Sequence, residues 1–165
     1  MKRTATATTC AAALLAAVLT GCSDNSGDTS GDGYGSTSSS ASPSKPATVD
    51  TKSVGKLGTI VVDEKGRTLY LFLADKKNKS NCTGDCAKAW PPLLSKGDAK
   101  AGKGVDQKLL DITKRSGGEE QVTYNGHPLY YYAGDTKPGQ TNGQALDQFG
   151  AEWYVLNAKG KQVED

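Results

Sequence analysis

The chain of 165 residues is poor in the side chains on which most catalytic and metal centres depend. It contains one histidine, His127, and one methionine, Met1. A closed zinc site takes four ligands, so His127 together with two cysteines would fall short. The sequence has no G-x-S-x-G segment for a serine nucleophile and no C-x-x-C-H segment for haem attachment. These absences disfavour serine hydrolases, zinc proteins and c-type cytochromes.

Long hydrophobic runs are also missing, because no stretch reaches the roughly 18 apolar residues of a membrane-spanning helix. The apolar run at residues 10–20 is shorter, follows two basic residues and ends in Leu-Thr-Gly-Cys at Cys22. This segment resembles a bacterial lipoprotein signal, in which Cys22 is lipidated and becomes the first residue of the mature protein. An ordinary secretory signal cut nearby is the alternative. We predict a signal peptide at residues 1–21 and a lipid anchor that holds the protein on the membrane, outside the cytoplasm.

Residues 23–53 contain no Leu, Ile, Phe or Trp and are dominated by Ser, Thr, Gly and Asp. Such a segment buries too little apolar surface to offset the entropy lost on ordering. We therefore predict that residues 22–53 comprise the lipidated cysteine and a disordered tether. A single folded domain should then occupy residues 54–165.

Charge is unevenly distributed within this domain. Residues 76–115 hold ten basic and four acidic residues, whereas residues 116–165 hold three basic and seven acidic residues. The asymmetry suits an anionic wall polymer or an envelope protein as partner, and an ordinary solvated surface is the alternative. Without clustered arginines or a recognised module, nucleic acid is not expected to bind.

The domain contains an internal repeat. The sequence GRTLYLFLAD at residues 66–75 aligns with GHPLYYYAGD at residues 126–135, and Trp90 aligns with Trp153 further on. Two repeats, at about residues 55–97 and 116–160, follow from this match. Neither repeat has enough apolar surface to form a core alone, so the two should pack on each other.

The local sequence signals are those of short strands separated by turns. Side chains at residues 68–73 are apolar on both faces, which indicates a strand covered on both sides. Asn125-Gly126 predicts a tight hairpin turn, and residues 86–90 predict a short helical turn near the cysteine pair. The expected fold is all-β and mostly antiparallel, a small barrel or sandwich of two hairpin-containing repeats. Its strands are expected at residues 59–62, 68–73, 109–114, 121–124, 129–133 and 153–156.

A more specific pattern, Y-x-[FWY]-x-x-D, occurs once in each repeat. It is formed by Tyr70, Phe72 and Asp75, and by Tyr130, Tyr132 and Asp135. With the stretch CTGDCAKAWPPL, this pattern makes the chain resemble the bacterial secreted-repeat lipoprotein family, whose biochemical function is undefined. The resemblance covers the folded domain and implies a secreted lipoprotein, but it implies no activity.

The motif side chains have simpler structural interpretations. Aromatic residues at strand spacing are expected to pack in the core, and Asp75 and Asp135 are expected to cap turns. The alternative is that the two carboxylates pair across the repeat as an acid/base dyad or metal site. His127 occupies the position of Arg67 in the first repeat, which favours an exposed hairpin position over a catalytic base.

Two cysteines remain after Cys10 leaves with the signal and Cys22 is lipidated. In an oxidising compartment, Cys82 and Cys86 are expected to form a disulfide, with a redox couple and a metal site as alternatives. We predict no cofactor. The function predicted is a non-enzymatic surface module that binds through strand edges and exposed aromatics. An extracytoplasmic redox or metal-handling lipoprotein that uses Cys82 and Cys86 is the alternative.

Overall fold

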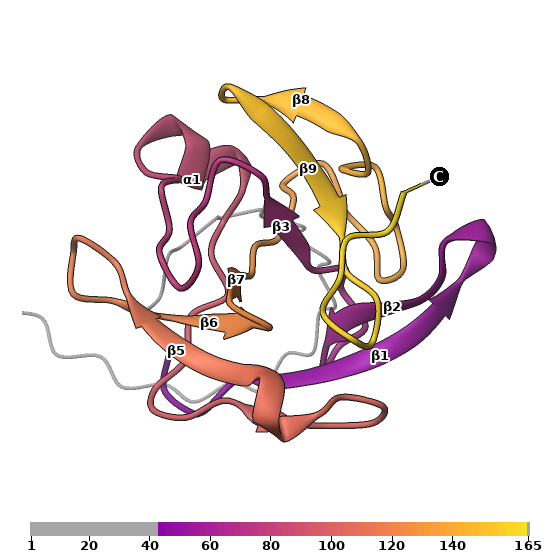
Figure 1. Ribbon diagram of the computed structural model, residues 1–165, viewed down its shortest axis with the longest axis horizontal. Coiled ribbons are helices and arrows are strands. Elements are labelled where there is room, and N and C mark those ends of the chain that lie inside the picture. The colour runs from indigo at the N-terminus through magenta and orange to yellow at the C-terminus, as the bar shows by residue number, and fades with distance from the viewer. Residues whose placement is uncertain (1–42, 165) are drawn as a thin grey trace, which may run out of the picture. The chain divides into compact units, whose positions relative to one another are not determined.

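A computed structural model describes residues 43–164. The predicted signal peptide, Cys22 and most of the predicted tether lie outside these residues. Within them, no helix has the length and apolar character needed to cross a membrane. The elements, shown in Figure 1, are β1 (Thr48–Val54), η1 (Gly55–Leu57), β2 (Gly58–Asp63), β3 (Tyr70–Phe72), α1 (Asp85–Ala89), β4 (Lys100–Ala101), η2 (Gln107–Leu109), β5 (Leu110–Lys114), β6 (Glu120–Tyr124), β7 (His127–Pro128), β8 (Leu146–Gln148) and β9 (Ala151–Val155).

The strands form three small sheets, with the orders β2-β1-β4, β3-β9-β8 and β5-β6-β7. Every pair of neighbours is antiparallel except β1 and β4, which run parallel. The predicted all-β, mostly antiparallel fold is confirmed, and so is the short helix beside the cysteines. The architecture is sandwich-like, and none of the three sheets in the described part of the chain closes into a barrel.

The predicted start of the domain at residue 54 is wrong, because β1 already begins at Thr48. Val49 is fully buried, and β1 pairs with β2 from Val49 to Val54. The segment lacks large apolar residues, so its composition resembled that of a tether. One buried valine and a continuous ladder of backbone hydrogen bonds are enough to order it, because the neighbouring strand supplies the rest of the core.

Strand β3 is covered on both faces, as its sequence predicts. Leu69 and Leu71 belong to one buried cluster, and Tyr70 and Phe72 belong to the other. Leu73, which the alternation also assigned to the core, is 45% exposed. The strand ends at Phe72, so the covering elements no longer enclose the next side chain.

The two repeats exchange strands rather than folding side by side. In the first repeat, β3 pairs with β9 of the second. In the second repeat, the backbone N–H groups of Tyr131 and Ala133 donate to the carbonyls of Pro91 and Ala89 in the first. Each motif segment therefore pairs with the segment that contains the tryptophan of the other repeat.

The strand predicted at residues 129–133 is irregular. The regular strand here, β7, covers only His127–Pro128, and Tyr130 forms isolated bridges with both Tyr70 and Pro92. Proline cannot donate a ladder hydrogen bond, so the bridge between Tyr130 and Pro92 does not extend into a regular ladder. Local β-propensity identified residues 129–133 as strand-like, but it did not reveal that a proline lies opposite this segment.

Candidate functional site

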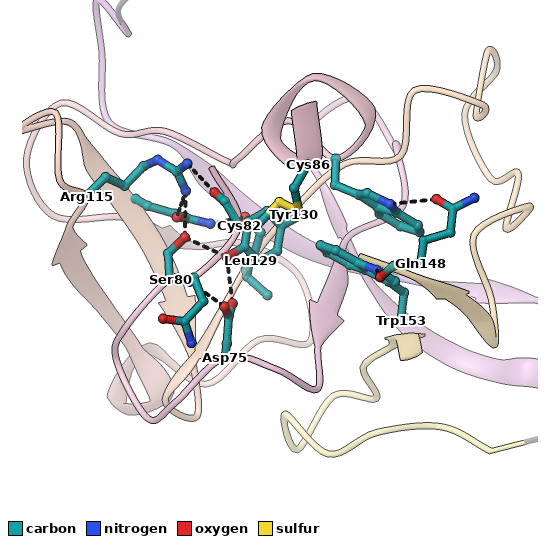
Figure 2. Close-up of a disulfide and its surroundings, with 12 residues drawn as sticks. Asp75, Ser80, Cys82, Cys86, Arg115, Leu129, Tyr130, Gln148 and Trp153 are labelled. Atoms are coloured by element: carbon teal, nitrogen blue, oxygen red, sulfur yellow. Dashed lines mark hydrogen bonds between the residues drawn. A yellow bond between two sulfur atoms is a disulfide. The ribbon is translucent and has the colours of Figure 1, made fainter. Parts of the chain in front are cut away.

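The motif tyrosines and aspartates bond across the repeats. The Tyr70 hydroxyl donates to Asp135 Oδ2 over 2.6 Å, and the Tyr130 hydroxyl donates to Asp75 Oδ2 over 2.6 Å. Figure 2 shows the second of these contacts. The tyrosine of each motif is therefore completed by the aspartate of the other motif.

This exchange follows from the way the two tyrosines pair. The Tyr70 N–H donates to the Tyr130 carbonyl over 2.8 Å, and the Tyr130 N–H donates to the Tyr70 carbonyl over 3.0 Å. Two backbones that bond reciprocally in this way are related by a local twofold axis. Each side chain then extends toward the turn that follows the other repeat's motif strand.

Each aspartate is held in a tight turn before it accepts the tyrosine. The Asp75 N–H donates to the Phe72 carbonyl, and Asp75 Oδ1 accepts the Asn81 N–H over 2.6 Å. Asp135 Oδ1 accepts the N–H of Asn142 over 2.9 Å in the same way. The prediction that these aspartates cap turns is confirmed. Both oxygens of each carboxylate are occupied, and the carboxylates bond to tyrosines rather than to each other.

Burial governs the ionisation of this cluster. Desolvation, reinforced by Asp135, raises the pKa of Tyr70 far above its usual value of 10.0. Desolvation and Asp75 act in the same direction on the pKa of Tyr130. Burial also raises the pKa of Asp75 above 3.8, although the hydrogen bond from Tyr130 opposes this shift. The tyrosines are therefore neutral donors at physiological pH, which suits them to holding the repeats together.

Four aromatic rings form one stack across the repeats. Phe72 lies on Trp153 with ring centroids 4.0 Å apart, and Trp153 lies on Trp90 at 3.9 Å with planes only 4° apart. Tyr132 covers the other face of Trp90 at 4.3 Å. Each of the three contacts in the stack joins one repeat to the other, so the third motif position also serves packing between repeats.

The motif tyrosines and one glutamine fix the orientation of the tryptophans. Tyr70 meets Trp90 edge to face at 5.3 Å, and Tyr130 meets Trp153 in the same way at 5.2 Å. The indole N–H groups donate to the side-chain and backbone oxygens of Gln148 over 3.0 Å each. Edge-to-face contacts and satisfied indole N–H groups are what buried aromatic clusters require.

The disulfide predicted between Cys82 and Cys86 is present. Cys82 is fully buried and Cys86 is 7% exposed. The bridge joins the residues before α1 to its first turn, and the chain-entropy model assigns such a short loop about 2 kcal/mol of stabilisation. Its sulfur atoms lie within the aromatic cluster rather than at a surface.

A buried arginine connects the disulfide loop to the motif. Arg115 donates to the Cys82 carbonyl over 2.6 Å, to Ser80 Oγ over 2.7 Å and to Gln121 Oε1 over 2.7 Å. Ser80 Oγ in turn forms a hydrogen bond with the Tyr130 hydroxyl over 2.8 Å (Figure 2). The Arg115 side chain is 6% exposed, and its planar guanidinium with five donors can satisfy these diverging acceptors at once.

The remaining candidates occupy structural positions. His127 lies in β7 directly after the Asn125-Gly126 turn, as predicted, but it is half-buried rather than exposed. Burial lowers its pKa below 6.5, so the imidazole is neutral at pH 7. Arg67, its counterpart, pairs with Asp63 over 2.7 Å and lies over the Tyr131 ring. The described residues contain no group of three or more His, Cys, Asp or Glu side chains placed to hold a metal ion.

Sequence reasoning missed several residues of this centre. Asn81 and Asn142 follow their aspartates at similar intervals, and this second repeat within the loops could have indicated them. Arg115 is one of three arginines in a chain rich in lysine. An arginine where the chain otherwise uses lysine is a sign of a bidentate or buried role. Gln148 gave no signal, because its function depends on the stacked pair that forms only in the tertiary structure.

Comparison with known proteins identifies one family. A family model described as a secreted repeat of unknown function matches residues 51–94 and 111–157, which together make up more than half of the chain. The two matched segments contain one Tyr–Asp motif and one stacked tryptophan each. No curated protein and no solved structure matches the chain significantly.

Proposed function

The chain belongs to the family of secreted repeats of unknown function, and from that premise we propose that it is a lipid-anchored, non-enzymatic binding module of the cell envelope. Cys22 carries the anchor, and the segment after it lets the domain reach partners away from the membrane. The rigid centre described above supports the exposed surface that makes the contact.

The motif geometry argues for a scaffold rather than a catalyst. A general acid or base must reach a substrate proton, but Asp75 and Asp135 already accept a tyrosine O–H and a backbone N–H each. The alternative redox role has less support, because thiol–disulfide exchange begins with attack on an accessible sulfur. Cys82 and Cys86 are buried.

One observation carries the binding role, namely the conformation of Phe149. This residue lies in the two-residue turn between β8 and β9, is 50% exposed and has a φ of 60°. A left-handed backbone is unfavourable for a bulky side chain. The chain uses Asn-Gly for the equivalent turn between β6 and β7, where Asn125 has a φ of 52°. Phe149 therefore keeps an exposed ring on a backbone conformation that asparagine would adopt more easily. This choice of residue is explained if the ring itself contacts a partner.

Leu73 extends this apolar surface. It is 45% exposed, and its N–H donates to the Glu152 carbonyl at the start of β9, beside the turn. Leu73 and Phe149 are the exposed large hydrophobic residues of the described chain. Strand β8, which leads into the Phe149 turn, is an edge strand of the β3-β9-β8 sheet, and a sheet edge beside exposed apolar side chains is a common docking surface for a partner.

Site-specific crosslinking in the intact envelope tests this role. A photoreactive phenylalanine analogue at position 149 should give a discrete crosslinked species. The same analogue at Lys56, an exposed position in η1, is the matched control and should give none. Equal products at both positions, or none at position 149, would contradict the proposed contact.

The anchor is tested separately. Cys22→Ala should release the protein from the membrane fraction or leave the precursor uncut, because the acyl chains supply the membrane affinity. Wild-type protein that remains membrane-bound with an unlipidated N-terminus would overturn this part of the proposal.

A further inference from the structure

Lysines from two separate turns gather around a third turn on the protein surface. Residues 76–79 form a tight loop closed by reciprocal backbone bonds between Lys76 and Lys79. The second turn, Asn157 to Lys161, is closed by the Asn157 N–H, which donates to the Lys161 carbonyl, and by the Gly160 N–H, which donates to the Asn157 carbonyl. Both pack against the Asn125-Gly126 turn of the β6–β7 hairpin. We name as the basic face the exposed lysines that these two turns contribute, which are Lys76, Lys77, Lys79, Lys159 and Lys161.

Direct contacts hold the loop at residues 76–79 against the Asn125-Gly126 turn. The Asn78 N–H donates to the Gly126 carbonyl over 2.8 Å. A Cβ on Gly126 would lie 2.9 Å from Lys77 Cγ, so the stem of this lysine rests on the glycine. Asn78 also accepts hydrogen bonds from the Thr113 and Thr123 hydroxyls. The lysine loop is therefore fixed to β5 and β6.

The other turn is fixed just as firmly to the same hairpin turn. Asn125 Nδ2 donates to the Gly160 carbonyl over 3.2 Å, and the Tyr124 hydroxyl donates to the Ala158 carbonyl over 2.7 Å. Asn157 Oδ1 accepts the N–H groups of Lys159 and Lys161. The backbones that carry the lysines are thus positioned before any ligand arrives.

The ammonium groups of the basic face form no ion pairs among the described residues. By contrast, the exposed Lys45 and Lys88 are each paired with a carboxylate. Asp75 directly precedes Lys76, but its carboxylate already accepts the Tyr130 O–H and the Asn81 N–H, and the Asp106 carboxylate accepts the Lys108 N–H. Several unpaired positive charges on one pre-formed surface attract a ligand that carries several negative charges.

We propose that the basic face binds a linear phosphate-containing polymer of the cell envelope. A chain of regularly spaced phosphates can contact both lysine turns at once, and the release of its counterions would drive binding. A membrane surface fits less well, because basic membrane-binding surfaces also bury apolar side chains. The exposed Phe149 lies at the β8–β9 turn, which Figure 1 places away from the β6–β7 hairpin.

This inference rests on the proposed function in one respect, namely that the domain lies outside the cytoplasm. Because polymer binding itself needs no membrane, it is tested on purified protein. Residues 23–165, which keep the whole described chain, are titrated into fluorescently labelled linear polyphosphate over a range of salt concentrations. The wild type should bind with an affinity that falls steeply with salt. Lys77→Gln with Lys159→Gln should lower the slope of log K against log salt by about one per lysine and weaken binding about tenfold at low salt.

The matched control is Lys56→Gln with Lys100→Gln, which removes the same charge from exposed lysines on other elements. It should leave more of the affinity intact than the basic-face variant does. Equal losses would show a net-charge effect and overturn the proposal, and so would wild-type binding that does not depend on salt.

Vesicles that contain phosphatidylglycerol distinguish a lipid source of phosphate from a polymer. Tighter binding to these vesicles than to polyphosphate, lost in the same Lys77 and Lys159 variant, would overturn the polymer in favour of a membrane surface. Failure of polyphosphate binding while position 149 still crosslinks in the envelope would refute the basic face alone. The proposed function would then stand without it.

Discussion

The Tyr70 hydroxyl donates to Asp135 over 2.6 Å, and these two residues belong to different repeats. The family motif places a tyrosine and an aspartate close together in each repeat, so its sequence suggests a self-contained unit. In the folded protein the motif is completed only by the other copy. The recurring residues therefore report the interface between repeats, which explains why a motif of this kind implies a fold without implying an activity.

This exchange gives a sharp test by double-mutant cycles. Tyr70→Phe should lower the free energy of unfolding by about 1–3 kcal/mol, because Asp135 loses its buried donor. Tyr70→Phe and Asp135→Asn should be strongly non-additive, since they remove one shared contact. Tyr70→Phe and Asp75→Asn, which touch separate contacts, should be closer to additive. Urea unfolding of the wild type, the three single variants and the two double variants measures both cycles. Stronger coupling within the first motif than across the repeats would contradict the structure.

The exchanged strands also predict that neither repeat folds alone. Residues 43–104 retain β3 but lose β9, and residues 105–164 retain β9 but lose β3. Each fragment should give poorly dispersed NMR spectra, because its motif strand and its tryptophan are exposed. The equimolar mixture should recover dispersed resonances. A well-dispersed spectrum from either fragment alone would show that the pairing between repeats is not needed for folding.

Much of this architecture could be predicted from sequence, because its determinants are local. Alternating apolar residues identified β3 and both its faces, Asn125-Gly126 identified a hairpin, and the aligned tryptophans identified the repeat. The exchange could not be predicted, since packing within a repeat and packing between repeats require the same apolar pattern. The start of β1 was missed for a similar reason, because its order comes from pairing with β2 rather than from its own composition.

The contacts around the motif residues likewise divide into those that could be predicted from sequence and those that could not. The turn-capping role of Asp75 and the bridge between Cys82 and Cys86 follow from residue chemistry and compartment. The stacked pair of Trp90 and Trp153 does not, because it brings together positions far apart in the chain. Arg115 joins the disulfide loop to the motif through tertiary contacts that no spacing in the sequence encodes.

Asp75 should change the pH dependence of stability. Burial raises its pKa in the folded protein above the ordinary value of 3.8. At pH values between the pKa of the unfolded state and that of the folded state, folded Asp75 binds a proton that unfolded Asp75 releases. The contribution of Asp75 to stability therefore increases as pH falls through the folded pKa. Relative to Asp75→Asn, the wild type should gain stability as pH is lowered from 7 toward 4. Urea unfolding at a series of pH values measures this difference. A difference that stays constant or shifts toward the variant would contradict the direction of the pKa shift.

Phe149 gives the last prediction, which concerns the cost of its backbone conformation to stability. Asparagine tolerates the left-handed backbone at this turn better than phenylalanine does, as Asn125 does in the other hairpin. Phe149→Asn should therefore raise the free energy of unfolding by up to about 1 kcal/mol. Phe149→Ala keeps the unfavourable backbone and also removes the ring, so it should give no such gain. Thermal and urea unfolding of the three proteins measure the change. If both variants were less stable than the wild type, the ring would be part of the fold and its exposure would need no partner to explain it.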